Sequence, residues 1–97
     1  MQYEEIYSTS KAEDFMREPG KKRLDGIVGV EALKNGVPTE VTFYYNNREP
    51  LAISGAFNIG YAGRGPRGLH DILIEAGFTE EQAEKVYITQ NYLSLKK

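Results

Sequence analysis

The segment Gly60–Gly68 gathers residue types that bind anions. Four glycines and two arginines fall within its nine residues. Glycine allows another group to approach the backbone closely, and a helix start after the segment would offer unpaired amides with partial positive charge. Arginine adds a planar, forked donor that suits phosphate or carboxylate. We therefore predict a binding site for an anionic group, in particular a phosphate. The predicted ligand-binding residues are Tyr61, Gly63, Arg64, Gly65 and Arg67.

Two other interpretations of this segment stay open. Glycines ahead of a helix can serve only a tight strand-to-helix corner, with both arginines solvated or paired nearby. Arg67 and Asp71 stand four residues apart, which is the spacing of a surface ion pair on a helix. The segment could instead contact a partner protein. Residues 63–68 also spell the dinucleotide fingerprint G-x-G-x-x-G, but that fingerprint acts inside a strand–helix–strand unit of a parallel sheet, for which residues 69–97 are too few.

His70 is the one side chain whose unperturbed pKa lies near neutral pH. On a helix its neighbour Asp71 would point about 100° away from it, so we expect no His–Asp dyad. No Ser, Thr or Lys is visibly placed for activation by His70. We therefore expect a structural histidine, no catalytic residues and no enzymatic activity.

Tyrosines supply a second candidate surface. Tyr44 and Tyr45 precede the Asn-Asn-Arg run at 46–48. With Tyr61 they could form a stacking surface for bases or the centre of a protein interface. Core packing with the hydroxyl groups at the surface is the alternative. We name Tyr44 and Tyr45 as the predicted partner-binding residues.

The composition excludes several classes of function. The chain has no cysteine and one histidine, whereas a structural zinc site needs four nitrogen or sulfur ligands. We therefore expect no metal, no thiol nucleophile and no cofactor. The net charge of −2 argues against non-specific binding of nucleic acid by the whole surface.

The length and the first residues bear on size and location. Ninety-seven residues predict a single domain over 1–97. The start of the chain, Met1–Glu5, is polar and acidic and lacks the basic and apolar regions of an export signal. No apolar run approaches the roughly 20 residues that span a bilayer. We expect a cytoplasmic protein that does not contact a membrane.

A short helix is expected near the N-terminus. Ser10 and Glu13 match a capping box, in which the two side chains satisfy free amides at a helix start. This pattern predicts a helix over about residues 11–18. The apolar residues before it do not decide between a brief strand and a tether for residues 3–7.

Strand patterns follow in the middle of the chain. Beta-branched and aromatic residues predict a hairpin over 24–45 that turns at Asn35-Gly36, because this dipeptide adopts positive φ easily. A third strand is expected near 51–61, where apolar residues alternate with small or polar ones.

Two helices are predicted in the C-terminal third. Apolar residues at the i, i+3, i+4, i+7 spacing of a core-facing helix predict a helix near 66–77. These residues are Leu69, Ile72, Leu73 and Ala76. Thr79 and Gln82 match a second capping box and predict a helix near 80–91. The segment 87–97 also has the pattern of a strand, so its end stays open.

Together these elements define the expected architecture. The fold class is α+β, with a small antiparallel sheet made of the hairpin 24–45 and the strand near 51–61. The C-terminal helices near 66–77 and 80–91 pack on one side of this sheet.

With the run Gly55-Ala56-Phe57-Asn58-Ile59-Gly60-Tyr61-Ala62-Gly63-Arg64-Gly65-Pro66, followed by the apolar helix Leu69–Ala76, the chain resembles a group of small uncharacterised proteins of bacteria, phages and plasmids. These proteins share a Phe-x-Trp-Gly-Tyr-x-Gly-x-Gly-Pro loop ahead of an amphipathic helix. The match covers about half the chain. Ile59 replaces the tryptophan, and Arg67 stands where the group favours a small residue. The resemblance implies an accessory protein of a mobile element, such as an antagonist of host defence.

The sequence thus predicts a non-enzymatic binding protein. Its ligand would be a phosphate-bearing nucleotide or a nucleic acid, sequestered through the segment Gly60–Gly68. The competing prediction is a stoichiometric inhibitor or adaptor that presents Tyr44 and Tyr45 to a host protein. A homo-oligomer is compatible with both predictions.

Overall fold

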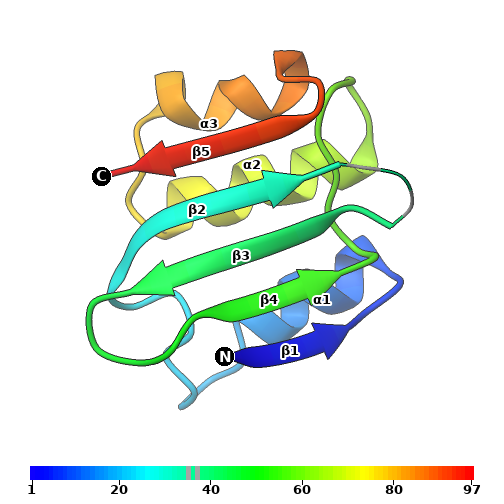
Figure 1. The fold of residues 1–97 in the computed structure, drawn as a ribbon. Helices are drawn as coiled ribbons and strands as arrows, with labels where there is room; N and C mark the ends of the chain where they lie inside the picture. Colours follow the sequence, from blue (N-terminus) through cyan, green and yellow to red (C-terminus); the bar gives the residue numbers. More distant parts are fainter. Residues whose placement is uncertain (35, 37) are drawn as a thin grey trace.

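The fold was obtained as a computed structural model, which describes residues 1–34, 36 and 38–97. In these residues a five-stranded mixed sheet is combined with three helices, so the predicted α+β class is confirmed (Figure 1). The elements in chain order are β1 Gln2–Glu5, α1 Thr9–Met16, β2 Ile27–Leu33, β3 Glu40–Tyr45, β4 Leu51–Ser54, α2 Arg64–Glu75, α3 Glu80–Ile88 and β5 Tyr92–Lys96.

The sheet has the strand order β1-β4-β3-β2-β5. Neighbouring strands are antiparallel except for β1 and β4, which run parallel with Tyr3 opposite Ala52. The sheet is therefore mixed rather than wholly antiparallel as expected. The difference arises because the N-terminal segment, which the sequence left open between strand and tether, pairs with the free edge of β4.

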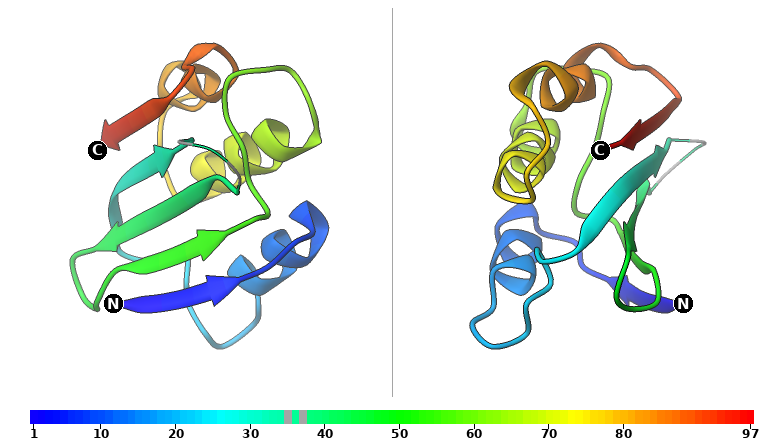
Figure 2. Two further views of the ribbon diagram at one scale, coloured as in Figure 1. Left: turned by 45° about the vertical axis from the view of Figure 1, so that its right-hand side comes forward. Right: turned by 90° about the vertical axis from the view of Figure 1, so that its left-hand side faces the viewer.

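The helices form one layer on one face of the sheet, and the other face carries no helix among the described residues (Figure 2). Alternate strand residues point toward the helices because side chains along a strand alternate between its two faces. Val30 of β2 lies between Phe43 of β3 and Leu95 of β5, and all three are buried. The predicted helix face of α2 packs on them, with Leu69 and Ile72 fully buried.

The helix boundaries differ from the predicted ones by a few residues. Helix α1 begins after Ser8, whose hydroxyl accepts a hydrogen bond from the backbone amide of Lys11 at 3.3 Å. The capping box predicted at Ser10 and Glu13 is wrong, because Glu13 is a buried ion-pair partner instead. Helix α2 begins at Arg64 rather than residue 66. The capping box of Thr79 and Gln82 at α3 is confirmed.

The predicted hairpin is confirmed as the pair β2 and β3, in which Ala32 lies opposite Val41. Its predicted turn contains Asn35, which lies outside the described residues. Helix α3 ends at Ile88, and the open C-terminal segment continues as β5. It does so because Leu93 and Leu95 alternate with exposed residues and complete the core beside β2.

Among the described residues, no helix combines the length and apolar character needed to cross a lipid bilayer.

Candidate anion-binding groove

The segment Gly60–Gly68 contains the end of the connection between β4 and α2 and the first residues of α2, and it forms the corner where α2 begins. Its glycines allow parts of the protein to pack closely. A side chain at Gly65 would bring its Cβ to 2.9 Å from Cβ of Asn58, and one at Gly63 would meet the ring of Tyr61. Gly60 has a φ of +91° and donates a hydrogen bond to the carbonyl of Val86 at 2.7 Å. A Cβ at Gly68 would clash with Cγ2 of Thr9, so the corner interpretation accounts for all four glycines of the segment.

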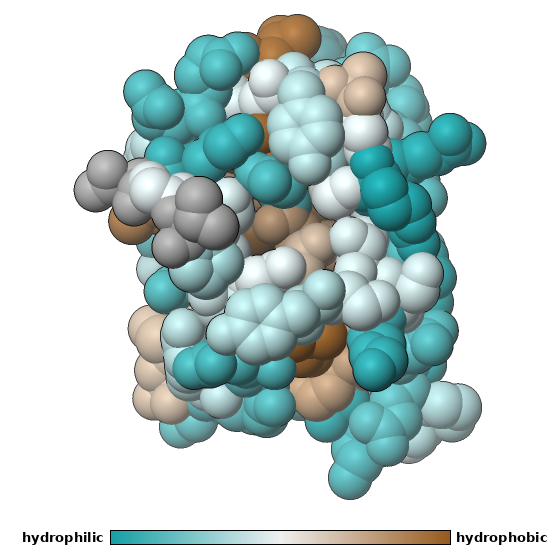
Figure 3. Space-filling model, turned by 90° about the vertical axis from the view of Figure 1, so that its right-hand side faces the viewer, coloured by the Kyte–Doolittle hydropathy of each residue, from teal (hydrophilic) through white to brown (hydrophobic). Residues whose placement is uncertain are grey.

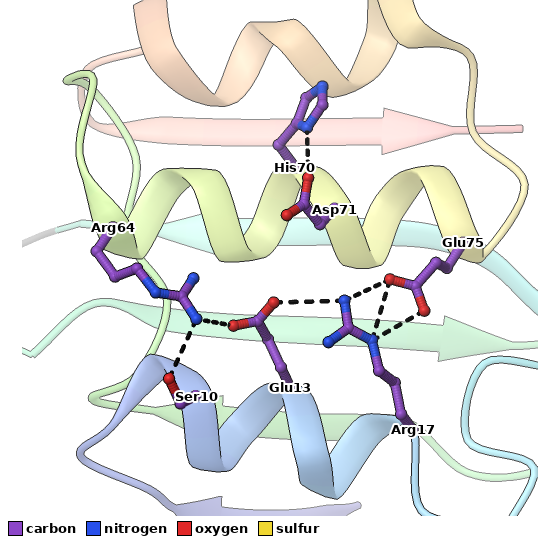
Figure 4. Close-up of polar contacts among 7 residues, drawn as sticks. All are labelled: Ser10, Glu13, Arg17, Arg64, His70, Asp71 and Glu75. Carbon is purple, nitrogen blue, oxygen red and sulfur yellow. Dashed lines mark hydrogen bonds and ion pairs between the residues drawn. The ribbon is translucent and has the colours of Figure 1, made fainter.

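Arg64 is bound within the protein. Its Nη2 donates hydrogen bonds to the carboxylate of Glu13 and, at 3.2 Å, to the hydroxyl of Ser10 (Figure 4). The side chain of Glu13 is 7% exposed and also lies 3.3 Å from Arg17. Arg17 in turn donates to the carboxylate of Glu75 from Nε at 2.9 Å. This chain of alternating charges, here called the α1–α2 ion network, joins the two helices and neutralises Arg64.

Arg67 differs from Arg64. Its side chain is exposed and makes no hydrogen bond or ion pair within residues 1–34, 36 and 38–97. The surface pair that the spacing of Arg67 and Asp71 allows is absent there, and Asp71 contacts His70 instead. Arg67 lines an open groove of about 610 Å³, here called the arginine groove. The groove is lined by Ala62, Gly63, Arg64, Arg67, His70, Asp71 and Tyr87.

His70 forms the wall of this groove. Its Nδ1 lies 3.1 Å from Asp71 Oδ1, and its Nε2 lies 2.8 Å from Glu80 Oε1 at the start of α3. The prediction that the neighbours His70 and Asp71 point too far apart to pair is wrong, because the two side chains lie within hydrogen-bonding distance. The His70 ring also lies against Tyr87, with 5.6 Å between ring centroids and 34° between ring planes.

The two carboxylates favour the charged form of His70. Burial of the ring lowers the pKa of His70, but the hydrogen bonds to Glu80 and Asp71 raise it by more. The pKa therefore lies above its ordinary value, and both ring N–H groups donate in the imidazolium form. This ion pairing links the start of α3 to α2.

A pH dependence of stability follows from this arrangement. Because the pKa of His70 is higher in the folded state than in the unfolded state, its pairing stabilises the protein fully below the unfolded pKa of about 6.5. This stabilisation is lost as the pH rises through the pKa of the folded state. We expect the melting temperature of the native protein to fall from pH ~6 to pH ~8.5 by more than that of His70→Gln. Thermal denaturation of both proteins at these pH values measures the difference. Equal decreases would show that the pairing stabilises nothing.

The predicted partner-binding pair does not form one surface. Tyr44 and Tyr45 are neighbours on β3 and therefore point to opposite faces of the sheet. Tyr44 donates to the carboxylate of Glu31 on the uncovered face, as does Tyr92 of β5. The Tyr45 hydroxyl donates to the carbonyl of Arg23 at 2.6 Å on the helix side. Burial raises the pKa of Tyr45.

The five predicted ligand-binding residues divide between two hollows. Gly63, Arg64 and Arg67 line the arginine groove. Tyr61 and Gly65 line a separate hollow on the other side of the segment. The Tyr61 side chain is 44% exposed, and its ring centroid lies 5.0 Å from Nζ of Lys34. The segment thus separates two hollows and does not gather all five residues around one ligand.

Sequence reasoning missed three residues of this region. The spacing of Ser10 and Glu13 suggested a capping box, and no sequence pattern marked Tyr87 as a site residue. Lys34 carried no pattern that pointed to a site. The charge of Glu13 within an otherwise apolar helix face, beside Ala12 and Met16, was the one signal that a cation must lie opposite.

Within the described part of the chain, no group of three or more His, Cys, Asp or Glu side chains is placed to hold a metal ion. No protein-family model, curated protein or solved structure matches the chain significantly.

Proposed function

We propose that the protein binds a phosphate-bearing ligand, a nucleotide or nucleic acid, in the arginine groove and sequesters it without converting it. One observation carries this proposal. Each of four arginines makes a side-chain hydrogen bond inside the protein, namely Arg17, Arg23, Arg48 and Arg64. Within the described residues, Arg67 makes none, although it lines a groove. Its guanidinium group is therefore available for a ligand.

The rest of the groove favours a nucleotide over an inorganic anion. The paired rings of His70 and Tyr87 offer an aromatic surface on which a base can stack. The Asp71 carboxylate accepts hydrogen bonds, which suits a ribose hydroxyl or a base amine. The guanidinium group of Arg67 suits a phosphate, with which it can form two parallel hydrogen bonds. The groove thus offers a partner for each part of a nucleotide: the guanidinium group for the phosphate, the aromatic rings for the base and the carboxylate for the ribose.

The state of His70 supports binding without catalysis. Each ring nitrogen lies within 3.1 Å of a carboxylate oxygen, so neither is available to accept a proton from a substrate. A cytoplasmic location and antagonism of host defence belong to the same proposal. The first is supported by the absence of cysteine, and the second by the resemblance of the loop to proteins of mobile elements.

Calorimetry tests the proposal directly. We expect one member of a panel of nucleotides, cyclic nucleotides and short oligonucleotides to bind, and Arg67→Ala to weaken that binding at least tenfold because the phosphate loses its partner. The matched control is Lys11→Ala, which removes an exposed cation of α1 outside the groove. A panel without any binding, or equal losses in both variants, would contradict the proposal.

A second candidate function is the protein inhibitor or adaptor. The observation that favours it is the uncovered sheet face, where Leu33 and Tyr92 are paired across β2 and β5 and are exposed. This function predicts that Leu33→Asp abolishes a defined protein complex and leaves nucleotide binding unchanged. If Leu33→Asp disrupts no protein complex, the inhibitor or adaptor function is excluded.

A further inference from the structure

The hollow lined by Tyr61 and Gly65, here called the second hollow, lies beside the C-terminal ends of the parallel strands β1 and β4. It has a volume of about 250 Å³. Figure 3 shows this side of the molecule, where brown and pale residues form the floor of a depression. The described residues that line it include no Asp or Glu. Its polar groups come from Thr9, Lys34, Thr39, Asn58 and Tyr61.

The Asn58 amide is held in one orientation. Its Oδ1 accepts a hydrogen bond from the hydroxyl of Thr39 at 2.9 Å and another from the backbone amide of Ile59 at 2.9 Å. Thr39 is buried, so this support is fixed by the core. Because two donors meet at the oxygen, the NH₂ end is turned away from them. It makes no hydrogen bond with the residues that the structure describes.

Lys34 places a cation at the same hollow. Its Nζ donates to the carbonyl of Ile59 at 3.0 Å and lies 5.0 Å from the ring centroid of Tyr61. An ammonium group has three donors, and this carbonyl takes one of them. The remaining N–H groups and the Asn58 NH₂ thus provide donors, and none of the described residues that line the hollow is acidic and could neutralise them.

The surrounding backbone favours the same charge. Helices α1 and α2 both begin at this edge of the sheet, after Ser8 and Gly63 respectively (Figure 1). Helix starts carry partial positive charge, which adds to that of Lys34. The volume lies below the range of about 300–1,000 Å³ that holds drug-sized ligands, so the hollow fits one small anionic group.

We propose that this hollow is a second binding site, which receives the carboxylate or phosphate group of a small ligand between the Asn58 amide and the Lys34 ammonium. It is independent of the nucleotide proposal, because Arg67 lines the arginine groove and not this hollow. The shared chemistry of the two ligand classes is a compact oxyanion with several acceptor lone pairs.

Two-dimensional NMR of the ¹⁵N-labelled protein tests the site, with inorganic phosphate and acetate added in separate titrations. We expect saturable shifts of the amides of residues 9, 39 and 58–65 with at least one of the two ions. The ion that saturates at the lower concentration identifies the ligand class. Absence of saturation with both ions would overturn the proposal.

Two variants give the test its specificity. Asn58→Asp keeps the oxygen that Thr39 and Ile59 require but removes the NH₂ donors and adds negative charge. Lys34→Met keeps the apolar stem and removes the cation. Each variant should weaken binding of the anion at least tenfold. If Asn58→Asp fails to fold, Lys34→Met alone tests the assignment. Unchanged binding in a folded Asn58→Asp or Lys34→Met would refute the assignment.

Arg67→Ala is the matched control, because it removes a cation from the neighbouring groove only. It should leave the titration unchanged. If Arg67→Ala alone abolished the shifts, the anion would be in the arginine groove, and the second site would not exist. Loss of nucleotide binding in this variant, with anion binding retained, would separate the two proposals.

Discussion

Replacing Phe57 with alanine is expected to lower the free energy of unfolding by about 3–5 kcal/mol. Phe57 follows β4 and is 1% exposed, and its ring meets that of Phe43 edge to face, with 6.5 Å between centroids and 83° between planes. Truncation removes buried apolar surface and leaves a cavity that the surrounding strands cannot fill. The free energy of unfolding of a domain of this size is about 5–15 kcal/mol in total, so the loss is a large part of its stability.

Urea denaturation followed by circular dichroism measures this loss. Tyr61→Ala is the matched control, since it removes an aromatic ring from the same segment at a half-exposed position. We expect the control to cost less than half as much. If Phe57→Ala costs no more than Tyr61→Ala, then Phe57 does not anchor the segment between β4 and α2.

Glu13→Ala should cost about 2 kcal/mol, because it breaks charge-assisted hydrogen bonds of a buried carboxylate. The α1–α2 ion network loses its central anion, and Arg64 and Arg17 are left facing each other across the helix contact. The cost stays below that of a fully buried charge, since Arg64 is 54% exposed and can turn into water.

A double-mutant cycle isolates this contact. Glu13→Ala and Arg64→Ala should be non-additive by about 0.5–3 kcal/mol, as expected for residues in one ion network. Glu13→Ala combined with Arg67→Ala should be additive, because no contact joins that pair within the described residues. Additive losses for Glu13 and Arg64 would show that Arg64 does not depend on this pairing and is available for a ligand.

Local patterns predicted much of the fold. The spacing of Leu69, Ile72 and Leu73 identified the buried face of α2, and Thr79 with Gln82 located the start of α3. The β-branched and aromatic residues of 24–45 identified the hairpin of β2 and β3. These features depend on contacts within one turn or one strand, which a sequence shows directly.

Features that depend on distant contacts were not predictable in this way. The parallel pairing of β1 with β4 joins residues far apart in sequence. Glu13 and Arg64 are separated by 51 positions, and no local rule links them. The start of α1 after Ser8 rather than after Ser10 fits the same pairing, because the side chains of Ser10 and Glu13 both accept hydrogen bonds from Arg64.

The candidate site was predictable only in part. The concentration of glycine and arginine identified the segment at the start of α2, but not which of its two arginines is paired within the described residues. The separation of Tyr44 from Tyr45 was predictable, because adjacent residues of a strand face opposite sides. The contact of His70 with Glu80 was not, since it requires the packing of α3 on α2.

Nuclear magnetic resonance of the arginine side-chain Nε–H groups would test most directly which arginine meets the ligand. The titrant is the nucleotide or oligonucleotide that binds most tightly in calorimetry. The Nε–H resonance of Arg67 should shift saturably with the calorimetric dissociation constant, while that of Arg64, held by Glu13, stays in place. A shift of Arg64 alone, or of neither arginine at saturation, would contradict binding through Arg67.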